Sequence, residues 1–201
     1  MNTTNKSYLL RNFLNIYSKE KGVTNHMRII IQFLLSNDAL DNYVMMSLKE
    51  FTGATKIKIS SLTISLRNLV NLSILDKKKL KNNSAYKINT QYISPIKNIP
   101  HINIDQEKDF NQIKQNLSVI YKDASLKCSS RLLLEYLYSF CIFEQWSQLD
   151  QPKQIISDLE MYNSTYHSSR ASLIKKMYIK VESGKKYQKF FIPLLKVVDN
   201  Q

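Results

Sequence analysis

Apolar residues in the first part of the chain recur every three or four positions, which is the period of an amphipathic helix. This spacing predicts a helix over residues 6–21 and a second helix over residues 25–35, both rich in Leu, Ile and Phe. Gly22 follows the first pattern, as expected where a helix ends. We therefore treat residues 1–24 as an N-terminal helix that is a candidate dimerisation arm.

A short helix with a well-defined start is expected next. Residues 43–46 predict an extended segment, and the sequence SLKE that follows, from Ser47 to Glu50, is a capping box. In a capping box the Ser47 hydroxyl accepts from the backbone N–H of Glu50, and the Glu50 carboxylate accepts from the N–H of Ser47. The pattern predicts a helix over residues 48–52 with a break at Gly53.

A longer helix is expected from the turn after Gly53 to about residue 72, with a start between Thr55 and Ser60. One face of this helix is apolar and holds Ile59, Leu62, Leu66, Leu69 and Val70. The opposite face is mainly polar and holds Ser60, Thr63, Ile64, Arg67, Asn68 and Asn71. For an isolated helix, a solvated surface explains such a polar face as well as a binding surface does.

A basic hairpin completes the first unit. Residues 74–77 predict a strand, residues 78–83 a basic turn and residues 85–88 the returning strand. Over residues 25–98 the order is therefore helix, strand, short helix, longer helix and basic hairpin. This is the order of a winged helix-turn-helix.

Three segments resemble bacterial winged helix-turn-helix proteins. Residues 44–55 (VMMSLKEFTGAT) look like the opening of the second helix, and residues 66–78 (LRNLVNLSILDKK) look like the passage from the third helix into the first wing strand. Residues 86–93 (YKINTQYI) are similar to the segment that closes the wing in small plasmid replication initiators. The resemblance covers about a third of the chain.

The resemblance implies a recognition helix that enters the major groove of DNA with its N-terminal half toward the base edges. The candidate readers are Ser60, Ser61, Thr63, Ile64 and Arg67, with Lys58 and Asn68 beside them. The wing would meet phosphates or the minor groove through Lys77, Lys78, Lys79 and Lys81.

The second half repeats this pattern less clearly. Helices are expected over residues 131–145, 152–161 and 165–178, followed by a hairpin around Gly184. We interpret residues 128–201 as a second winged-helix-like domain, similar to the paired winged helices of plasmid initiators, and residues 99–127 as a connector. The expected fold class is α+β, mainly α with small β-hairpins, with two winged helix-turn-helix units in tandem.

The second unit also offers candidate DNA contacts. Its third helix would present Ser168, Ser169, Arg170, Ser172, Lys175 and Lys176, and its wing would present Lys185, Lys186 and Lys189. A competing interpretation makes the apolar helix a dimerisation face consisting of Leu132, Leu133, Leu134, Tyr136, Leu137, Phe140 and Phe143.

The charge distribution agrees with a nucleic-acid partner. The formal net charge is +13, although an AT-rich coding sequence explains the total equally well, since only five of the 29 basic residues are Arg. Residues 43–98 carry ten basic against two acidic side chains, and residues 163–198 carry eight against one, whereas residues 99–127 carry four of each. Two basic blocks flank a neutral segment, and each block is expected to face phosphates.

Other classes of function find little support. With three glycines the chain offers no Walker or Rossmann phosphate loop. The spacing of Cys128 and Cys141 suits neither a zinc knuckle nor a redox pair, and His26, His101 and His167 form no ligand motif. We expect no cofactor, no metal and no enzymatic activity. Neither a signal peptide nor a membrane span is expected, so the protein should be cytoplasmic.

The sequence therefore predicts a sequence-specific double-stranded DNA-binding protein of the plasmid replication initiator type. A dimeric winged-helix transcription regulator is the alternative within the same class, because the same fold serves both roles. A protein interaction adaptor on a winged-helix scaffold is the alternative from another class. The expected partners are double-stranded DNA and a second copy of the chain, with no membrane.

Overall fold

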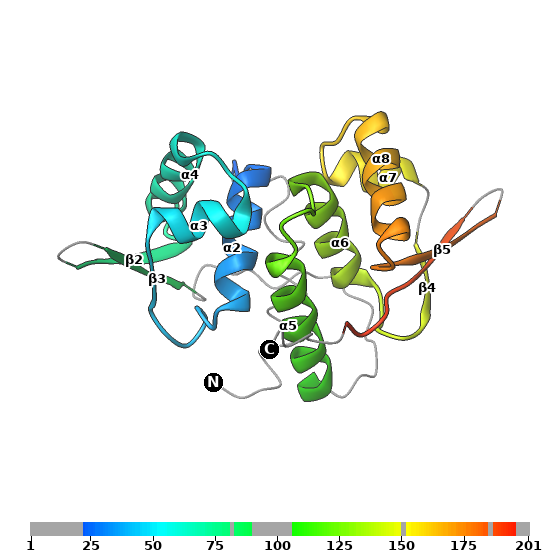
Figure 1. Cartoon of the computed structure of the whole chain (residues 1–201), viewed down its shortest axis with the longest axis horizontal. Coiled ribbons are helices and arrows are strands. Elements are labelled where there is room, and N and C mark those ends of the chain that lie inside the picture. The colour runs from blue at the N-terminus through cyan, green and yellow to red at the C-terminus, as the bar shows by residue number, and fades with distance from the viewer. Residues whose placement is uncertain (1–21, 81–82, 90–105, 150–151, 185–186, 196–201) are drawn as a thin grey trace.

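The chain is an α+β protein whose two small sheets lie at opposite ends of the molecule, with helices between them (Figure 1). The computed structural model describes residues 22–80, 83–89, 106–149, 152–184 and 187–195. Within these residues there are seven helices and two antiparallel three-stranded sheets. The helix expected over residues 6–21 lies outside the described residues, as do Lys81, Lys185 and Lys186.

The N-terminal unit contains the expected elements in the expected order. They are α2 (Asn25–Ser36), β1 (Val44–Met46), α3 (Leu48–Thr55), α4 (Ile59–Asn71), β2 (Leu75–Lys79) and β3 (Ser84–Ile88). The strand order in the sheet is β1-β3-β2, so the first strand adds to the hairpin. Lys78 and Lys79 were expected in the turn but belong to β2, where they pair with Ala85 and Ser84.

The predicted capping box at the start of α3 is confirmed. The Ser47 N–H donates to Glu50 Oε2 over 2.7 Å, and the Glu50 N–H donates to Ser47 Oγ over 3.2 Å. The expected break at Gly53 is wrong, because α3 continues to Thr55 and ends at Lys56, whose φ of 60° is left-handed. The turn into α4 is thus three residues long, and Lys58 is the N-cap of α4.

The predicted apolar face of α4 is mostly buried. Leu62, Leu66 and Leu69 pack into the core together with Ser65. Ile59 departs from the expectation, because it lies at the first position of α4 and is 56% exposed. Leucines spaced along one side therefore fix which face of α4 remains in solvent.

The C-terminal unit repeats the order of the first. Its elements are α6 (Cys128–Phe140), β4 (Trp146–Leu149), α7 (Pro152–Asp158), α8 (Asn163–Lys175), β5 (Lys180–Ser183) and β6 (Gln188–Phe191). Sequence reasoning extended the first helix to residue 145 and missed β4. The helix ends earlier because Cys141 is extended and Glu144 adopts a left-handed φ of 59°, which turns the chain back to pair with β6.

The two units match almost residue for residue. Helices α4 and α8 span residues 59–71 and 163–175, so both ends differ by 104 positions (163 minus 59, and 175 minus 71). The same shift relates two pairs of left-handed residues, Lys56 with Glu160 and Ser73 with Met177. We call residues separated by this shift counterparts.

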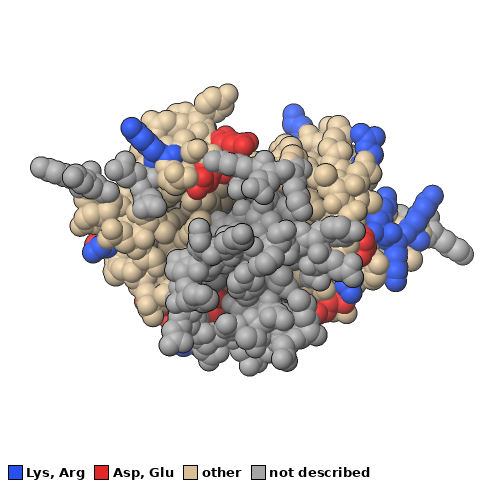
Figure 2. Space-filling model, turned by 180° about the vertical axis from the view of Figure 1, so that it is seen from behind, with Lys and Arg blue, Asp and Glu red and all other residues tan. Residues whose placement is uncertain are grey.

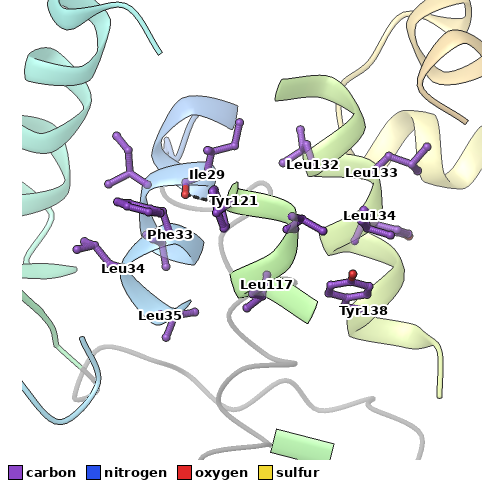
Figure 3. Close-up of a cluster of buried hydrophobic side chains, with 14 of the residues drawn as sticks. Ile29, Phe33, Leu34, Leu35, Leu117, Tyr121, Leu132, Leu133, Leu134 and Tyr138 are labelled. Carbon is purple, nitrogen blue, oxygen red and sulfur yellow. Dashed lines mark hydrogen bonds between the residues drawn. The ribbon is translucent and has the colours of Figure 1, made fainter. Parts of the chain in front are cut away.

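Helix α5 (Gln106–Lys122) packs between the two units. Residues 99–127 were expected to act as a connector, yet α5 buries Ile113, Leu117, Ile120 and Tyr121 in the common core. Figure 3 shows Leu117 and Tyr121 between side chains of α2 and side chains of α6. This segment is therefore part of the hydrophobic core and does not only link the two units.

The apolar side of α6 is buried within the chain. Leu133, Leu134 and Leu137 have no exposed surface, and they belong to the same core cluster as residues of α2, α5 and α8. The interpretation of Leu132 to Phe143 as a dimerisation face is therefore wrong, because intrachain packing already covers it.

A buried polar contact joins the three central helices. The Tyr121 hydroxyl lies 3.0 Å from the Ile29 carbonyl oxygen and 2.6 Å from Glu135 Oε1. One phenol hydrogen cannot serve both acceptors, so both contacts are satisfied when a neutral Glu135 carboxyl donates to Tyr121. Burial raises the pKa of Glu135 well above its ordinary value, and the Tyr121 hydrogen bond and the charges of Arg131 and Arg28 offset this only in part.

We expect Glu135→Gln to gain stability relative to wild type as the pH rises. The folded-state pKa of Glu135 is raised, so above its ordinary pKa of 4.5 the unfolded chain loses a proton that the folded chain retains, and wild-type stability falls. Glutamine stays neutral and retains a donor for Tyr121. Urea unfolding of both proteins between about pH 4.5 and pH 8 measures the difference; a difference that does not change with pH would show that Glu135 is ionised in the fold.

Candidate nucleic-acid interface

A groove opens in the N-terminal unit between α4, the start of α3 and the β2–β3 hairpin. Its volume is about 520 Å³. Its apolar lining includes Met46, Leu48, Phe51, Leu66, Val70, Leu80 and Tyr86, and its polar lining consists of Ser47, Thr63, Arg67, Asn71, Lys77, Lys79, Asn83 and Ser84. The groove thus brings together predicted readers on α4 and predicted wing lysines.

The register of the hairpin sorts the three consecutive lysines of β2. Side chains alternate between the two faces of a strand. Lys77 pairs with Tyr86 and Lys79 with Ser84, and all four residues line the groove. Lys78 projects from the other face, where its Nζ lies 4.0 Å from the ring centre of Tyr43. Two of the three lysines therefore face the groove.

The solvent face of α4 presents a row of four predicted readers. Ser60, Thr63, Ile64 and Arg67 are all exposed, and they follow the three and four residue spacing of one helix face. Ile64 is 51% exposed, although it is a large apolar side chain. The Thr63 hydroxyl donates to the Ile59 carbonyl oxygen over 2.8 Å, so its own oxygen remains available as an acceptor.

The remaining residues predicted near α4 lie at its margins. Lys58 is exposed at the N-cap and makes no side-chain capping bond. Ser61 and Asn68 are half-buried on the flanks of the helix. These three side chains border the row of readers without belonging to it.

Positive charge gathers at this end of the molecule. Figure 2 shows Lys and Arg side chains around the hairpin that projects at the right of that view, which is β2–β3 of Figure 1. No carboxylate among the described residues forms an ion pair with Arg67, Lys77 or Lys79. Their charges are therefore available to an anionic partner.

The C-terminal unit buries one predicted contact and pairs a second with a carboxylate. Ser169 is 2% exposed, and its hydroxyl donates to Ser129 Oγ over 2.9 Å, so it is an internal packing residue. Lys176 Nζ lies 2.5 Å from Ser125 Oγ and 3.4 Å from Asp123 Oδ2, which ties the end of α8 to the loop between α5 and α6. Ser169 is therefore not placed to contact DNA, whereas Lys176 is exposed and paired within the chain.

Asp123 is the centre of that loop contact. Burial alone would raise the pKa of Asp123, but hydrogen bonds from Ser125 and Tyr178 and the charge of Lys176 lower it to about 2. The carboxylate therefore stays ionised at neutral pH and holds Lys176 in place.

Other predicted residues of the C-terminal unit remain near the surface. Ser168 and Lys175 are exposed, while Arg170, Ser172 and Lys189 are half-buried. Lys189 Nζ lies 5.5 Å from the ring centre of Tyr187. These residues are spread over α8 and β6.

Sequence reasoning missed several surface residues. Ser47 and Asn71 line the groove, although the first was regarded only as a cap and the second only as part of a polar face. Lys180 lies exposed on β5 with its Nζ 5.1 Å from the ring centre of Phe191. Alternation along the second hairpin was the available signal for Lys180.

Within the described residues, no group of three or more His, Cys, Asp or Glu side chains is placed to hold a metal ion. In the same part of the chain, no helix combines the length and apolar character needed to cross a bilayer. No protein-family model matches the chain, and a search of curated proteins finds no match either. The geometry of the chain itself therefore carries the functional argument.

Proposed function

We propose that this chain is a sequence-specific double-stranded DNA-binding protein of the plasmid replication initiator type. In this proposal both units are winged helices, with α4 and α8 as recognition helices and the β2–β3 and β5–β6 hairpins as wings. The repeated order of helix, strand, two helices and hairpin supports the assignment. The resemblance of residues 44–93 to such proteins points the same way.

The observation that carries the proposal is the groove that α4 shares with the hairpin. A helix fits the major groove of B-DNA, and a wing beside it meets the neighbouring sugar–phosphate strand. Arg67 lies on α4 and Lys77 and Lys79 on β2, yet all three line one groove. Two elements with separate sequence signals thus converge on one cationic surface.

The second unit provides an internal control for this argument. The counterparts of Arg67, Lys77 and Lys79 are Ala171, Val181 and Ser183. Since the C-terminal unit forms the same elements without these cations, the fold does not require them. A role outside the fold explains their convergence in the N-terminal unit.

The exposed row on α4 supplies the chemistry of base recognition. The hydroxyls of Ser60 and Thr63 suit several base edges, and Ile64 suits a thymine methyl group. Arg67 suits bidentate hydrogen bonding to the O6 and N7 atoms of guanine. Lys58, Lys77 and Lys79 would hold the phosphates and set the register.

The placement of the two units favours an initiator over a dimeric regulator. Helices α4 and α8 lie on the same side of the molecule, while the two hairpins project in opposite directions (Figure 1). One chain thus presents two helices to one duplex. The apolar side of α6, one of the two segments through which a dimeric regulator was expected to pair, is buried within the chain, and the other, the helix expected over residues 6–21, lies outside the described residues.

Lys77→Ala and Lys79→Ala should each weaken binding to all DNA sequences and reduce the salt dependence of binding. Each lost phosphate contact is expected to lower the slope of log affinity against log salt by about 0.9. Lys78→Ala is the matched control, because it removes the same charge from the opposite face of β2. Fluorescence anisotropy at salt concentrations from about 50 to about 200 mM measures the slopes.

Equal slopes for Lys78→Ala and Lys79→Ala would contradict the assignment of the groove to a phosphate strand. A wild-type protein that binds no duplex at low salt would instead support the adaptor alternative. Circular dichroism of each variant checks that the fold is retained.

Arg67→Ala should relax base choice. On a site selected from random DNA we expect a loss of about 1–3 kcal/mol, with a much smaller loss on unrelated DNA. Repeating the selection with the variant should show reduced preference at one or two positions. Lys79→Ala serves as the comparison, since a phosphate contact weakens both kinds of DNA alike; an equal loss on both for Arg67→Ala would remove Arg67 from the readers.

A further inference from the structure

The first helix of the C-terminal unit bonds to the end of a helix in the N-terminal unit. Arg131 Nη1 on α6 donates to the carbonyl oxygen of Ala54, and Cys128 Sγ donates to that of Thr55 over 3.3 Å. Ala54 and Thr55 are the last two residues of α3. The contact therefore lies directly before the turn that leads into α4.

The first helix of the N-terminal unit makes the reciprocal contact. Arg28 Nη2 on α2 donates to the Asp158 carbonyl oxygen over 3.4 Å, and Asn25 Nδ2 donates to that of Leu159 over 3.3 Å. Asp158 ends α7, and Leu159 follows it in the turn toward α8. Each unit thus binds the end of the other unit's short helix.

The two contacts are related by the internal repeat, although their donors are 103 positions apart (128 minus 25, and 131 minus 28) and not 104. Ala54 and Asp158 are counterparts, as are Thr55 and Leu159, because both pairs differ by 104 positions. In each contact the arginine follows the second donor by three residues, at Arg28 after Asn25 and at Arg131 after Cys128. Such an exchange of like contacts is the mark of an approximate two-fold interface, here within one chain.

Both arginines are buried, so each buried guanidinium needs hydrogen-bond partners within the protein. Arg131 has no exposed surface and Arg28 is 6% exposed. Burial lowers the pKa of Arg28, and the charges of Glu160 and Asp158 offset this only in part. A buried cation that loses its partners is strongly destabilising, so any slide or rotation of one unit against the other is opposed. The carbonyl ends of helices are favourable partners, because the helix dipole is negative there.

These contacts act on the recognition helices. From Thr55 to the start of α4 at Ile59, and from Leu159 to the start of α8 at Asn163, only three residues intervene. An arginine of one unit therefore anchors the backbone that leads into the recognition helix of the other.

We propose that Arg28 and Arg131 are positioning residues that fix the separation and relative rotation of α4 and α8, and so the spacing between two half-sites that one chain accepts. The inference rests on the proposed DNA binding. Each inserted base pair rotates one half-site by about 34° relative to the other, since a turn of B-DNA holds about 10.5 base pairs. Two rigidly held helices tolerate little of this rotation.

The test compares Arg28→Met, which keeps the length of the side chain but removes the donor, with Arg28→Lys, which retains a donor and the charge. The DNA is the site selected by wild type, with the two halves separated further by zero to three inserted base pairs. Wild type and Arg28→Lys should lose at least about tenfold in affinity on insertion of two base pairs, whereas Arg28→Met should lose less than about threefold. Affinity for an isolated half-site should be alike in all three proteins.

A second measurement does not depend on DNA. Spin labels on non-natural residues that replace the exposed N-caps Lys58 and Tyr162 report the distance between α4 and α8. One narrow distance distribution is expected in wild type and Arg28→Lys, and a broad distribution in Arg28→Met. If wild type binds no DNA but these distributions differ as expected, the DNA-binding proposal fails while the positioning role stands. An unchanged distribution in Arg28→Met, or an unchanged dependence on spacing, overturns the positioning role.

Discussion

The packing of α3, α5 and α6 depends on the buried positive charge of Arg131. Arg131 is completely buried, and a buried guanidinium requires fixed polar partners. It finds them at two helix ends, since it donates to the carbonyl oxygen of Ala54 at the end of α3 and to that of Asp123, just after α5, over 2.9 Å. The ring of Tyr121 lies 5.3 Å from its central carbon. Three elements from different parts of the chain therefore meet at one side chain.

Local chemistry made the N-terminal unit predictable. The capping box of Ser47 and Glu50 acts within four residues, and the leucines of α4 report one face of one helix, so neither depends on distant contacts. The helix end predicted at Gly53 was wrong because α3 tolerates a glycine in its interior. The left-handed residue that ends α3 is Lys56. The alternation of Lys77, Lys78 and Lys79 was also local, but their division between two faces needed the register with β3.

The errors in the second half have non-local causes. Residues 99–127 looked like a connector because their charges balance, although Ile113, Leu117 and Tyr121 follow helical spacing. Strand β4 is defined by its pairing with β6, in which Trp146 lies opposite Phe191 and Leu149 opposite Gln188, and no local signal separates it from the end of α6. Ser169 resembled a surface residue, but its partner Ser129 lies 40 positions away in sequence.

On the proposed function, the repeat and the reciprocal contacts together would give a complex with DNA that has one orientation. Two-fold packing would make the two reading surfaces equivalent, yet Thr63 and Ile64 have His167 and Ser168 as counterparts. On the proposed function the two surfaces would therefore differ in the bases that they prefer, even though their backbones match. A rigid pair of unlike surfaces fits an asymmetric site in one direction only, because reversal would place each helix against the bases suited to the other. On the proposed function, a single chain would thus mark both the position and the direction of its site.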